Sequence, residues 1–260
     1  MPARTTPGTA VLMSFTLAAA LGVAGCATKP PASDKDATAE YEQTNDPLEP
    51  TNRVFYDVND ALDRYTLKPI AQGYVFITPQ PVRTGIGHVL DNLGSPVLFA
   101  NDVAQAKPRR AGTTFMRFLI NSTAGVLGIF DVAKSVGYKA HDTDFGITMA
   151  LWGVPEGPFL YLPFLGPSSV RGATGFAGDI ALDPFTYVPR DHGLLTLNWA
   201  RFGMSAINTR ANLLTDVDKI KASALDPYAS FRSLYRQHVA AQVEAARNDN
   251  RVTPPAWQGQ

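Results

Sequence analysis

The sequence of 260 residues contains one cysteine, Cys26. A chain with a single cysteine forms no internal disulfide, so its folded state depends on packing and hydrogen bonding. Charged residues are also scarce, at 18% of the chain against about 25% in an average soluble domain. Glycine and proline are abundant instead, with 41 residues between them. This composition predicts several short helices with more apolar surface than water usually permits.

The chain has no excess of positive charge, with 23 Lys and Arg residues against 23 Asp and Glu residues. Its first 25 residues contain Arg4 and no acidic residue, so the remainder has 22 basic and 23 acidic residues and a net charge of −1. Proteins that bind nucleic acid present a basic stripe to the phosphate backbone. The charge balance therefore excludes nucleic acid as an expected partner.

Beyond the N-terminal region, the apolar runs are too short or too broken for a membrane-spanning helix, which needs about 20 consecutive apolar residues. The clearest case is "GPFLYLPFLGPSS", from Gly157 to Ser169. Three prolines divide its six large apolar residues and prevent a long helix. We expect this stretch to be irregular or briefly extended. It fits either a buried connector in the core or an apolar segment in contact with a membrane.

The N-terminus has the features of a bacterial secretory signal. Arg4 precedes an apolar run that ends in small residues, "AVLMSFTLAAALGVAG". The four residues "VAGC", at positions 23–26, match the lipobox at which the cysteine of a bacterial lipoprotein is acylated. A free cysteine that happens to follow a signal peptide is the alternative. We predict a signal peptide over residues 1–25 and lipidation of Cys26, which would hold the chain firmly on a membrane.

After this anchor, residues 26–44 are polar and contain prolines, which predicts a flexible tether. We assign residues 45–247 to one folded domain and residues 248–260 to a disordered tail. The domain is expected to be mainly α and to consist of many short amphipathic helices. In the first of these helices, apolar residues recur at intervals of three and four. They are Val54, Val58, Ala61, Leu62 and Tyr65.

Glycine, proline and capping residues predict where the later helices begin and end. Gly94 is expected to end a helix that follows Pro81, and Gly153 to follow the end of another. Each expected helix start is marked by a capping residue, in some cases followed by a proline. These starts are Ser95-Pro96, Asp142 or Thr143 and Asp226-Pro227, while Asp183-Pro184 is expected to restart the chain after another short helix.

The most apolar long segment of the domain runs from Thr113 to Gly137. Polar and small residues divide it into two expected helices. The dividing residues are Asn121, Ser122, Thr123, Gly125 and Gly128. The glycines would let neighbouring backbones approach closely. A buried helical hairpin and a membrane-contacting one are both compatible with this segment.

The sequence lacks the recognisable parts of a hydrolase or of a cofactor enzyme. "GPSSV" does not have the glycine that follows the serine of a G-x-S-x-G elbow, and "TGIGHV" lacks the third glycine and the preceding strand of a dinucleotide site. "HDTD", at positions 141–144, could hold a metal ion, but helix capping explains its aspartates without one. We expect no catalytic residue, no metal and no cofactor.

Several segments, taken in order, resemble the MlaA/VacJ family of outer-membrane lipoproteins. They are "NDPLEPTNRVFYDVNDALDRYTLKPIAQGY", "PQPVRTGIGHVLDNLGSP", "RFLINSTAGVLGIFDVA" and "DFGITMALWGVPEGPFLYLPFLGPSSVRG". The resemblance runs from Asn45 to Pro184 and continues more weakly through "TRANLL" and "DPYASFRSLY". At His88-Val89 the chain departs from the Asn-Phe of many members, which affects a local contact and not the assignment.

The resemblance implies a lipid transporter rather than an enzyme. Members of the family remove mislocalised phospholipids from the outer leaflet and so maintain the lipid asymmetry of the outer membrane. They form a helical ring in the periplasmic leaflet around an amphipathic channel, associate with porin trimers and pass lipid to a soluble periplasmic carrier of the Mla pathway. By the sorting rule of such lipoproteins, Ala27 in place of Asp favours the outer membrane of a Gram-negative bacterium. The alternatives are a porin-associated structural or assembly lipoprotein without transport activity, and a lipid hydrolase.

On this interpretation, three regions contribute to the ring and are candidates for contact with the channel or the membrane. Their residues are Asn92, Leu93, Gly94, Asn121, Gly125, Leu127, Gly128, Trp152, Phe159, Leu160, Leu162, Phe164 and Leu165. A charged residue introduced at Leu160 or Leu127 is expected to reduce membrane embedding or lipid passage.

Overall fold

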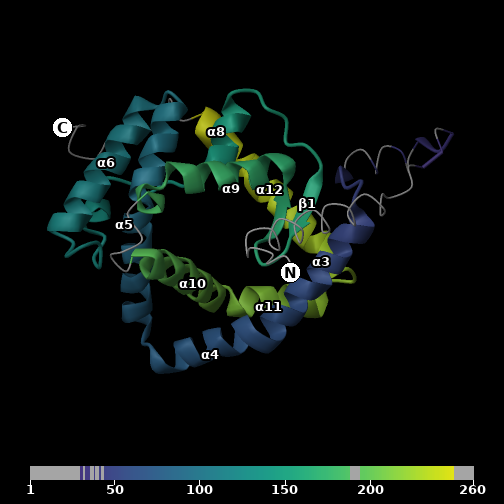
Figure 1. Cartoon of the computed structure of the whole chain (residues 1–260), viewed down its shortest axis with the longest axis horizontal. Helices are drawn as coiled ribbons and strands as arrows, with labels where there is room; N and C mark the ends of the chain where they lie inside the picture. The colour runs from purple at the N-terminus through teal and green to yellow at the C-terminus, as the bar shows by residue number, and fades with distance from the viewer. Residues whose placement is uncertain are drawn as a thin grey trace, which may run out of the picture. The chain divides into compact units, whose positions relative to one another are not determined.

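The structure of the chain is a computed structural model that describes residues 44–187 and 194–248, together with residues 30, 31, 33–35, 38 and 41 (Figure 1). The signal peptide, Cys26, most of the tether and most of the C-terminal tail lie outside the described residues, so the predictions for them stay predictions. Contacts divide the chain into two compact units. Unit 1 comprises Met1–Asp60 and Gly157–Val170, and unit 2 comprises Ala61–Glu156 and Arg171–Gln260.

Unit 1 combines a helix with a two-stranded antiparallel hairpin. The helix is α3 (Glu49–Leu62), and the strands are β1 (Phe159–Leu162) and β2 (Gly166–Ser169). The first residue of each strand pairs with the last residue of the other. Phe164 and Gly166 adopt positive φ angles of 66° and 86° where the chain reverses. The expected brief extension is confirmed, although the sequence did not predict the hairpin.

Two asparagine side chains of α3 bind backbone groups of β1 and of the turn that follows it. The amide of Asn52 donates to the carbonyl oxygen of Phe159 over 3.1 Å and accepts from the backbone N–H of Tyr161 over 2.8 Å. Two helical turns further along, the amide of Asn59 makes the same pair of bonds, starting from the carbonyl oxygen of Leu162, both at 2.8 Å. Each amide satisfies backbone groups that would otherwise lack a partner in the sheet. The polar face of α3 therefore completes the hairpin.

The described part of unit 2 is helical apart from its connections. Its helices are the π-helix η1 (Asp63–Leu67), α4 (Lys68–Ile77), α5 (Gln80–Ala104), α6 (Pro108–Thr123), α7 (Val132–Ser135), α8 (Phe145–Leu151), α9 (Val170–Leu182, whose first residue belongs to unit 1), the 3₁₀-helix η2 (Pro184–Thr186), α10 (Leu194–Asn212), α11 (Leu214–Ser223) and α12 (Pro227–Arg247). Contacts join α5 to α8, α8 to α12, α12 to α11 and α11 to α4, and α10 packs on both α4 and α5 (Figure 1). Because α5 follows α4 in the chain, these contacts form a closed circuit within unit 2.

Helix α5 is continuous, so the predicted break at Gly94 and Ser95-Pro96 is wrong. Proline removes the N–H that would bond to the carbonyl oxygen of Asn92. Within the same turn, the hydroxyl of Ser95 donates to the carbonyl oxygen of Asp91 over 3.2 Å. The helix packs against α6, α8 and α10, and such tertiary contacts outweigh a local preference to stop. Gly94 and Ser95-Pro96, which were expected to separate two helices, thus lie inside one 25-residue helix.

Aspartate side chains cap the later helices. Asp183 and Asp226 each accept from a backbone N–H in the first turn of η2 and α12, and the cap at Asp226 was predicted from Asp226-Pro227. Asp144 does the same for α8 over 2.7 Å. The predicted cap at Asp142 or Thr143 is therefore wrong by one or two residues, because the hydroxyl of Thr143 instead accepts from Gln105, the residue that follows α5.

The apolar segment that starts at Thr113 is divided as predicted. Helix α6 ends at Thr123, and a seven-residue turn, residues 124–130, followed by the capping residue Asp131, separates it from α7. The second helix is shorter than expected, at four residues. The turn, rather than a second long helix, is the main feature of this segment.

Polar side chains fill the interior of unit 2 where α5, α6, α8 and α9 meet. Asn101 and Asp102 of α5 have no exposed surface. Asn101 donates to Asp179 of α9 over 2.7 Å and accepts from Thr148 of α8 over 2.8 Å. Asp102 accepts from Thr114 of α6 over 2.6 Å. Satisfied polar bonds, rather than a large apolar core, therefore hold these helices in register.

Candidate functional site

The surface of the described residues is richer in large apolar side chains than their interior. Four such side chains are buried, whereas 33 are exposed. The buried ones are Ile147, Phe159, Tyr161 and Tyr228. Large apolar side chains of water-soluble proteins are usually among the most buried. The distribution here is reversed, which suits a chain whose surroundings are partly apolar.

The apolar stripe predicted for the first helix faces outward. Val54, Val58 and Leu62 of α3 and Tyr65 of η1 recur at intervals of three or four, and all four are exposed. The residue that this helix buries is Asn52, whose amide binds β1. The helix is amphipathic as predicted, but its polar face is the one that packs.

The turn at residues 124–130 presents a cluster of exposed apolar side chains in unit 2. They are Val126, Leu127, Ile129 and Phe130, and Leu127 is 74% exposed. Val126 and Leu127 have φ angles of 53° and 59°. A positive φ is uncommon for a branched side chain, so this backbone is strained. The surrounding structure must therefore hold the turn in place.

Contacts with α5 supply part of that support. The buried amide of Asn92 donates to the hydroxyl of Ser122 over 2.9 Å and to the carbonyl oxygen of Leu127 over 3.5 Å. Gly128 adopts a φ of 95°, and an added Cβ there would lie 2.6 Å from the Cβ of Asn92. The close approach of α5 and the turn therefore requires glycine at this position.

The end of α6 supplies the rest of the support. The buried amide of Asn121 donates to Asp131 over 3.0 Å and accepts from the backbone N–H of Ala133 over 2.9 Å. At Gly125 an added Cβ would lie 2.3 Å from the carbonyl oxygen of Phe130. Of the predicted site residues in this region, Leu127 lies on the surface, whereas the asparagines and glycines lie beneath it.

The hairpin of unit 1 divides its predicted site residues between core and surface. Phe159 is 2% exposed and is a core residue of the hairpin, while Leu160 and Leu162 are half-buried. At the tip, Phe164 is 79% exposed and Leu165 is exposed as well. The tip, rather than the strands, therefore offers the apolar surface of this segment.

Three predicted site residues lie elsewhere in unit 2. Leu93 and Gly94 are half-buried positions in the middle of α5. Trp152 follows α8 and is exposed, and its indole N–H donates to the carbonyl oxygen of Ala104 over 3.0 Å. Its ring meets the edge of Phe145 at 5.6 Å between centroids. An exposed tryptophan with a satisfied N–H is typical of a boundary between apolar and aqueous surroundings.

Two residues of the His141–Asp144 segment make structural contacts. Nε2 of His141 lies 2.9 and 3.1 Å from the two carboxylate oxygens of Asp102, and Asp144 caps α8. Across the described ranges, no group of three or more His, Cys, Asp or Glu side chains could hold a metal ion. The interpretation of these aspartates as capping residues therefore holds for Asp144.

Asp179, in the polar interior, has an altered acidity. Burial raises the pKa of this carboxyl to about 6, although hydrogen bonds from Asn101 and from the N–H of Phe145 oppose the rise. The carboxyl joins α9 to α5 and α8. It sets the helix arrangement, and the negative charge of the nearby Asp144 adds to the rise in its pKa.

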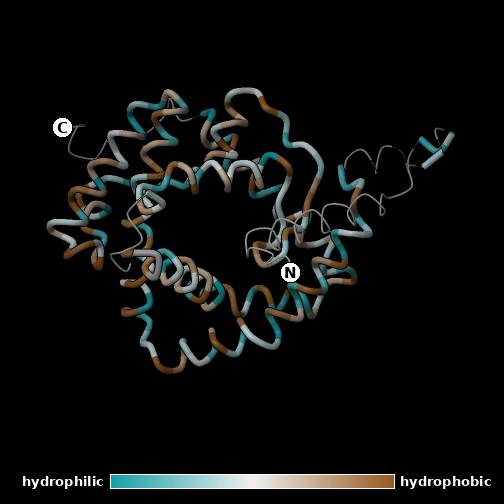
Figure 2. Tube along the Cα trace, in the orientation of Figure 1, coloured by the Kyte–Doolittle hydropathy of each residue, from teal (hydrophilic) through white to brown (hydrophobic). Residues whose placement is uncertain are grey.

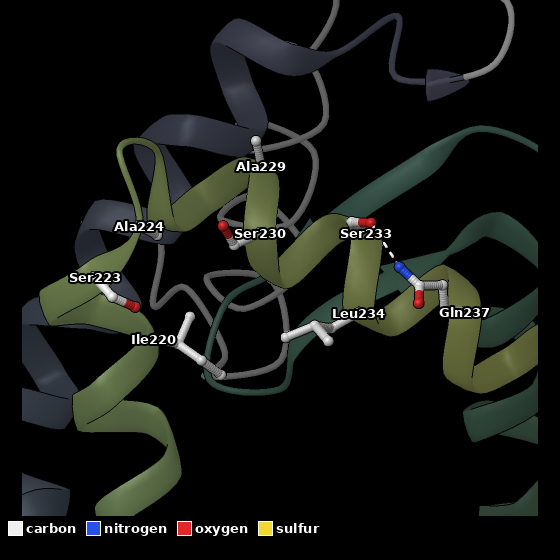
Figure 3. A pocket seen from close by; sticks show the side chains of 8 residues that line it. All are labelled: Ile220, Ser223, Ala224, Ala229, Ser230, Ser233, Leu234 and Gln237. Carbon is white, nitrogen blue, oxygen red and sulfur yellow. Dashed lines mark hydrogen bonds between the residues drawn. The ribbon is translucent and has the colours of Figure 1, made fainter.

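An open groove of about 580 Å³ lies between α11 and α12 (Figure 3). Two aliphatic side chains, Ile220 and Leu234, share its walls with small and polar residues. Within it, the amide of Gln237 donates to the hydroxyl of Ser233 over 2.9 Å. Its eight lining residues include no charged side chain, so the groove offers no acid–base or metal chemistry.

Hydrophobic positions alternate with hydrophilic ones along the helices rather than forming one continuous run (Figure 2). Among the helices that the structure describes, none has the length and apolar character needed to cross a membrane. The apolar surface is therefore spread over stripes, turns and the hairpin tip.

Sequence reasoning missed two sets of residues that shape this surface. Asn52 and Asn59 hold the hairpin, and their spacing of seven residues on one helix face was the available signal. The corner between α4 and α5 exposes Phe76, Ile77 and Val82, with Phe76 at 92%. A Pro-rich corner between two helices gave no reason to expect an exposed aromatic ring.

Comparison with known proteins gives a consistent result. The family model described as MlaA lipoprotein matches residues 44–242. "Intermembrane phospholipid transport system lipoprotein MlaA" of Haemophilus influenzae is 31% identical over 232 residues, which cover 87% of this chain and 88% of that protein. The protein of the same name in Escherichia coli is 34% identical over 206 residues, covering 76% and 78%.

A solved structure reported under "Structural basis for maintenance of bacterial outer membrane lipid asymmetry" is also similar. It superposes with a TM-score of 0.66 at 30% identity and covers 76% of this chain and 98% of that chain. The matches extend across both compact units. They confirm the predicted mainly α fold as a single domain.

Proposed function

This chain belongs to the MlaA lipoprotein family, and on that premise we propose that it moves phospholipid between the membranes of a Gram-negative envelope. In this proposal it is anchored to the outer membrane through Cys26, takes mislocalised phospholipids from the outer leaflet and so maintains lipid asymmetry. The names of its relatives in Haemophilus influenzae and Escherichia coli refer to such a transport system.

The reversed distribution of apolar side chains is the observation that carries the proposal. A phospholipid has an apolar body and a charged head, so a protein that handles it needs apolar and polar surfaces close together. Here α3 packs through asparagines and exposes valines, and α5 packs through buried polar side chains. Acyl chains in place of water would remove the cost of exposing the apolar residues.

We place these apolar surfaces in the periplasmic leaflet of the outer membrane. Helices that are amphipathic and too weakly apolar to span a bilayer suit insertion into one leaflet. The closed circuit of helix contacts within unit 2 supports the further proposal of a ring around an amphipathic channel. Non-helical backbone at membrane depth is tolerated where it is buried in protein or lines a cavity, and Asn92 and Asn121 give the turn at residues 124–130 such support.

The proposed partners follow from the same role. A lipid taken from the outer membrane must cross an aqueous periplasm, which calls for a soluble carrier that covers its acyl chains. Porin trimers are the proposed neighbours in the membrane. The protein itself would catalyse no bond change and would need no cofactor, so energy for transport would come from partners.

Deletion and complementation test the proposal. Cells that lack this protein should accumulate phospholipid in the outer leaflet, measured by labelling from the outside, and the intact chain should reverse this. A Cys26→Ala variant should fail to do so, because it lacks the lipid anchor. Normal asymmetry in the deletion strain would contradict transport and favour a structural role beside porins.

A second measurement separates transport from hydrolysis. Purified protein incubated with labelled phospholipid should leave the lipid intact. Release of fatty acid or of a headgroup would contradict the transport proposal and support the hydrolase alternative.

A further inference from the structure

Arg83, near the start of α5, differs from other arginines of unit 2 in its partners. Arg117, Arg201 and Arg210 each form an ion pair with an aspartate, at distances of 3.0, 3.1 and 2.6 Å. Arg83 forms none of the ion pairs found in the described part of the chain, and one of its terminal nitrogens donates to the side-chain oxygen of Gln80. Among the described residues, no carboxylate therefore forms an ion pair with its positive charge.

The inner nitrogen of the Arg83 guanidinium also lacks a hydrogen-bond partner in the described ranges of the chain. This Nε atom is buried, while the residue as a whole is half-buried and keeps part of its surface exposed. Burying a donor without an acceptor costs free energy. Guanidinium binds phosphate oxygens through two parallel N–H groups, so a turn of the Arg83 side chain away from Gln80 would let a phosphate satisfy Nε and a terminal nitrogen together.

Neutral polar groups from two other helices lie in the same region. The hydroxyl of Tyr74 in α4 donates to the side-chain oxygen of Asn208 in α10 over 3.2 Å. The amide nitrogen of Asn208 approaches α5 at Gly87, where an added Cβ would lie 3.2 Å from it. Burial raises the pKa of Tyr74, and the positive charge of Arg83 opposes that rise. The guanidinium is therefore near enough to act on the tyrosine hydroxyl.

Exposed apolar side chains flank this polar group along the chain. Phe76 and Ile77 end α4, Val82 precedes Arg83 in α5, and all three are exposed. An uncompensated cation beside exposed apolar residues matches an amphiphile with an anionic head and apolar tails. Arginine also reaches from apolar surroundings to lipid phosphates in membrane proteins.

We propose that the corner between α4 and α5 binds the phosphate group of a glycerophospholipid, with Arg83 as its principal donor and Tyr74 and Asn208 as neighbouring polar contacts. The acyl chains then lie against Phe76, Ile77 and Val82. This site rests on the proposed function and deepens it, because it names the chemical group by which this part of the protein holds its lipid.

Equilibrium binding to three probes tests the site, with the full-length chain in a phosphate-free sugar detergent. The probes are short-chain phosphatidylglycerol, the matching diacylglycerol without phosphate, and inorganic phosphate. Arg83→Gln should weaken phosphatidylglycerol binding by about tenfold or more, because it removes a charged hydrogen-bond donor. Diacylglycerol binding should not change. Arg83→Lys keeps the charge but loses the paired N–H groups, so its affinity should be intermediate.

The matched control is Arg109→Gln, because Arg109 is an exposed arginine on α6. Its variant should bind all three probes as the unaltered chain does. Competition by inorganic phosphate distinguishes a site for free phosphate from one that requires the lipid, and we expect the lipid to bind more tightly. Equal phosphatidylglycerol affinity in Arg83→Gln and the unaltered chain overturns the proposal. So does an equal loss for diacylglycerol, since that would reflect general damage to the surface.

The deletion strain keeps this outcome separate from that of the proposed function. If the unaltered chain restores lipid asymmetry while Arg83→Gln binds phosphatidylglycerol normally, the phosphate site is wrong and the transport function stands. If the unaltered chain does not restore asymmetry, the function itself fails, whatever the binding assay shows.

Discussion

The hairpin tip of unit 1 and the turn of unit 2 are both non-helical and apolar, yet they are held in different ways. Asn59 binds the backbone around the hairpin tip from more than 100 residues earlier in the chain, at separations of 103 and 105 residues. The turn at residues 124–130 is held mainly by close packing, of Gly125 against the end of α6 and of Gly128 against Asn92 of α5, where no side chain fits. The hairpin should therefore be sensitive to loss of a polar side chain, and the turn to the addition of a methyl group.

Adding a methyl group at Gly125 should have the largest effect. In Gly125→Ala the new Cβ would meet the carbonyl oxygens of Phe130 and Asn121 at 2.3 and 2.5 Å, so backbone must move. We expect the free energy of unfolding to fall by about 3 kcal/mol. Urea unfolding in detergent, followed by circular dichroism, measures the change.

Gly94→Ala is the control for that substitution. No atom lies within 4 Å of its added Cβ, and the position is in the middle of α5. Alanine should stabilise the helix there by about 0.5–1 kcal/mol, because it loses less backbone entropy than glycine. Equal effects of the two substitutions would show that the turn does not depend on close packing.

Removing an asparagine amide should destabilise the hairpin by a smaller amount. Asn52→Ala removes two buried hydrogen bonds, to the backbone of Phe159 and of Tyr161, so the free energy of unfolding should fall by about 2 kcal/mol. Asn59→Ala, at a half-buried position, should cost about 1 kcal/mol. Hydrogen exchange of the Tyr161 and Phe164 amides reports the local effect. Asn212→Ala, at an exposed position, serves as the control and should change stability by less than about 0.5 kcal/mol.

Two phenylalanines of the hairpin separate stability from membrane contact. Phe164→Ser should leave the unfolding free energy within about 0.5 kcal/mol, since the side chain is 79% exposed. It should weaken binding of the unacylated Cys26→Ala chain to vesicles several-fold, measured by flotation. Phe159→Ser removes a buried ring and should lower stability by about 3 kcal/mol. If Phe164→Ser binds vesicles normally, the tip does not contact lipid.

The pH dependence through Asp179 should be the smallest effect. Its folded-state pKa is raised from 3.8 to about 6, so the folded chain binds more protons than the unfolded chain between these values. The contribution of this carboxyl to stability therefore falls as the pH rises from about 4 to about 6 and is constant above that range. Because the group is partly solvated, the change should be on the order of 1 kcal/mol.

Asp179→Asn should remove this component. Comparison of its urea midpoint with that of the unaltered chain at pH 4.5 and 7.5 isolates the carboxyl from other titrating groups. Compared with the unaltered chain, the variant should be more stable at pH 7.5 than it is at pH 4.5. An unchanged difference between the two chains at both pH values would contradict the raised pKa.

The same two regions show how far the sequence predicts the structure. The break between Asn121 and Gly128 could be predicted because its cause lies within the segment: asparagine and glycine favour turns. The hairpin could not be predicted, since its edge is satisfied by Asn52 and Asn59 of a distant helix. Periodicity identified the apolar stripe of α3 but not the direction it faces.

The α5 helix shows the limit of predicting helix ends from single glycines and prolines. Gly94 and Pro96 predicted a break, yet packing on three other helices keeps them within one helix. For the candidate site, the apolar composition of the two segments predicted which regions matter. Which of their residues reach the surface depended on contacts between elements, as the difference between Phe159 and Phe164 shows.

The central claim is that the exposed apolar residues of both regions contact acyl chains. Cys26 is the only cysteine of the chain and is the proposed acylation site, so a cysteine introduced at Phe164 or Leu127 can be labelled alone with a fluorophore. In reconstituted membranes, lipids that carry a quencher on their acyl chains should quench both labels, and a label at exposed Lys219 should respond to a water-soluble quencher instead. Quenching of the Phe164 and Leu127 labels by the water-soluble quencher alone would contradict the account.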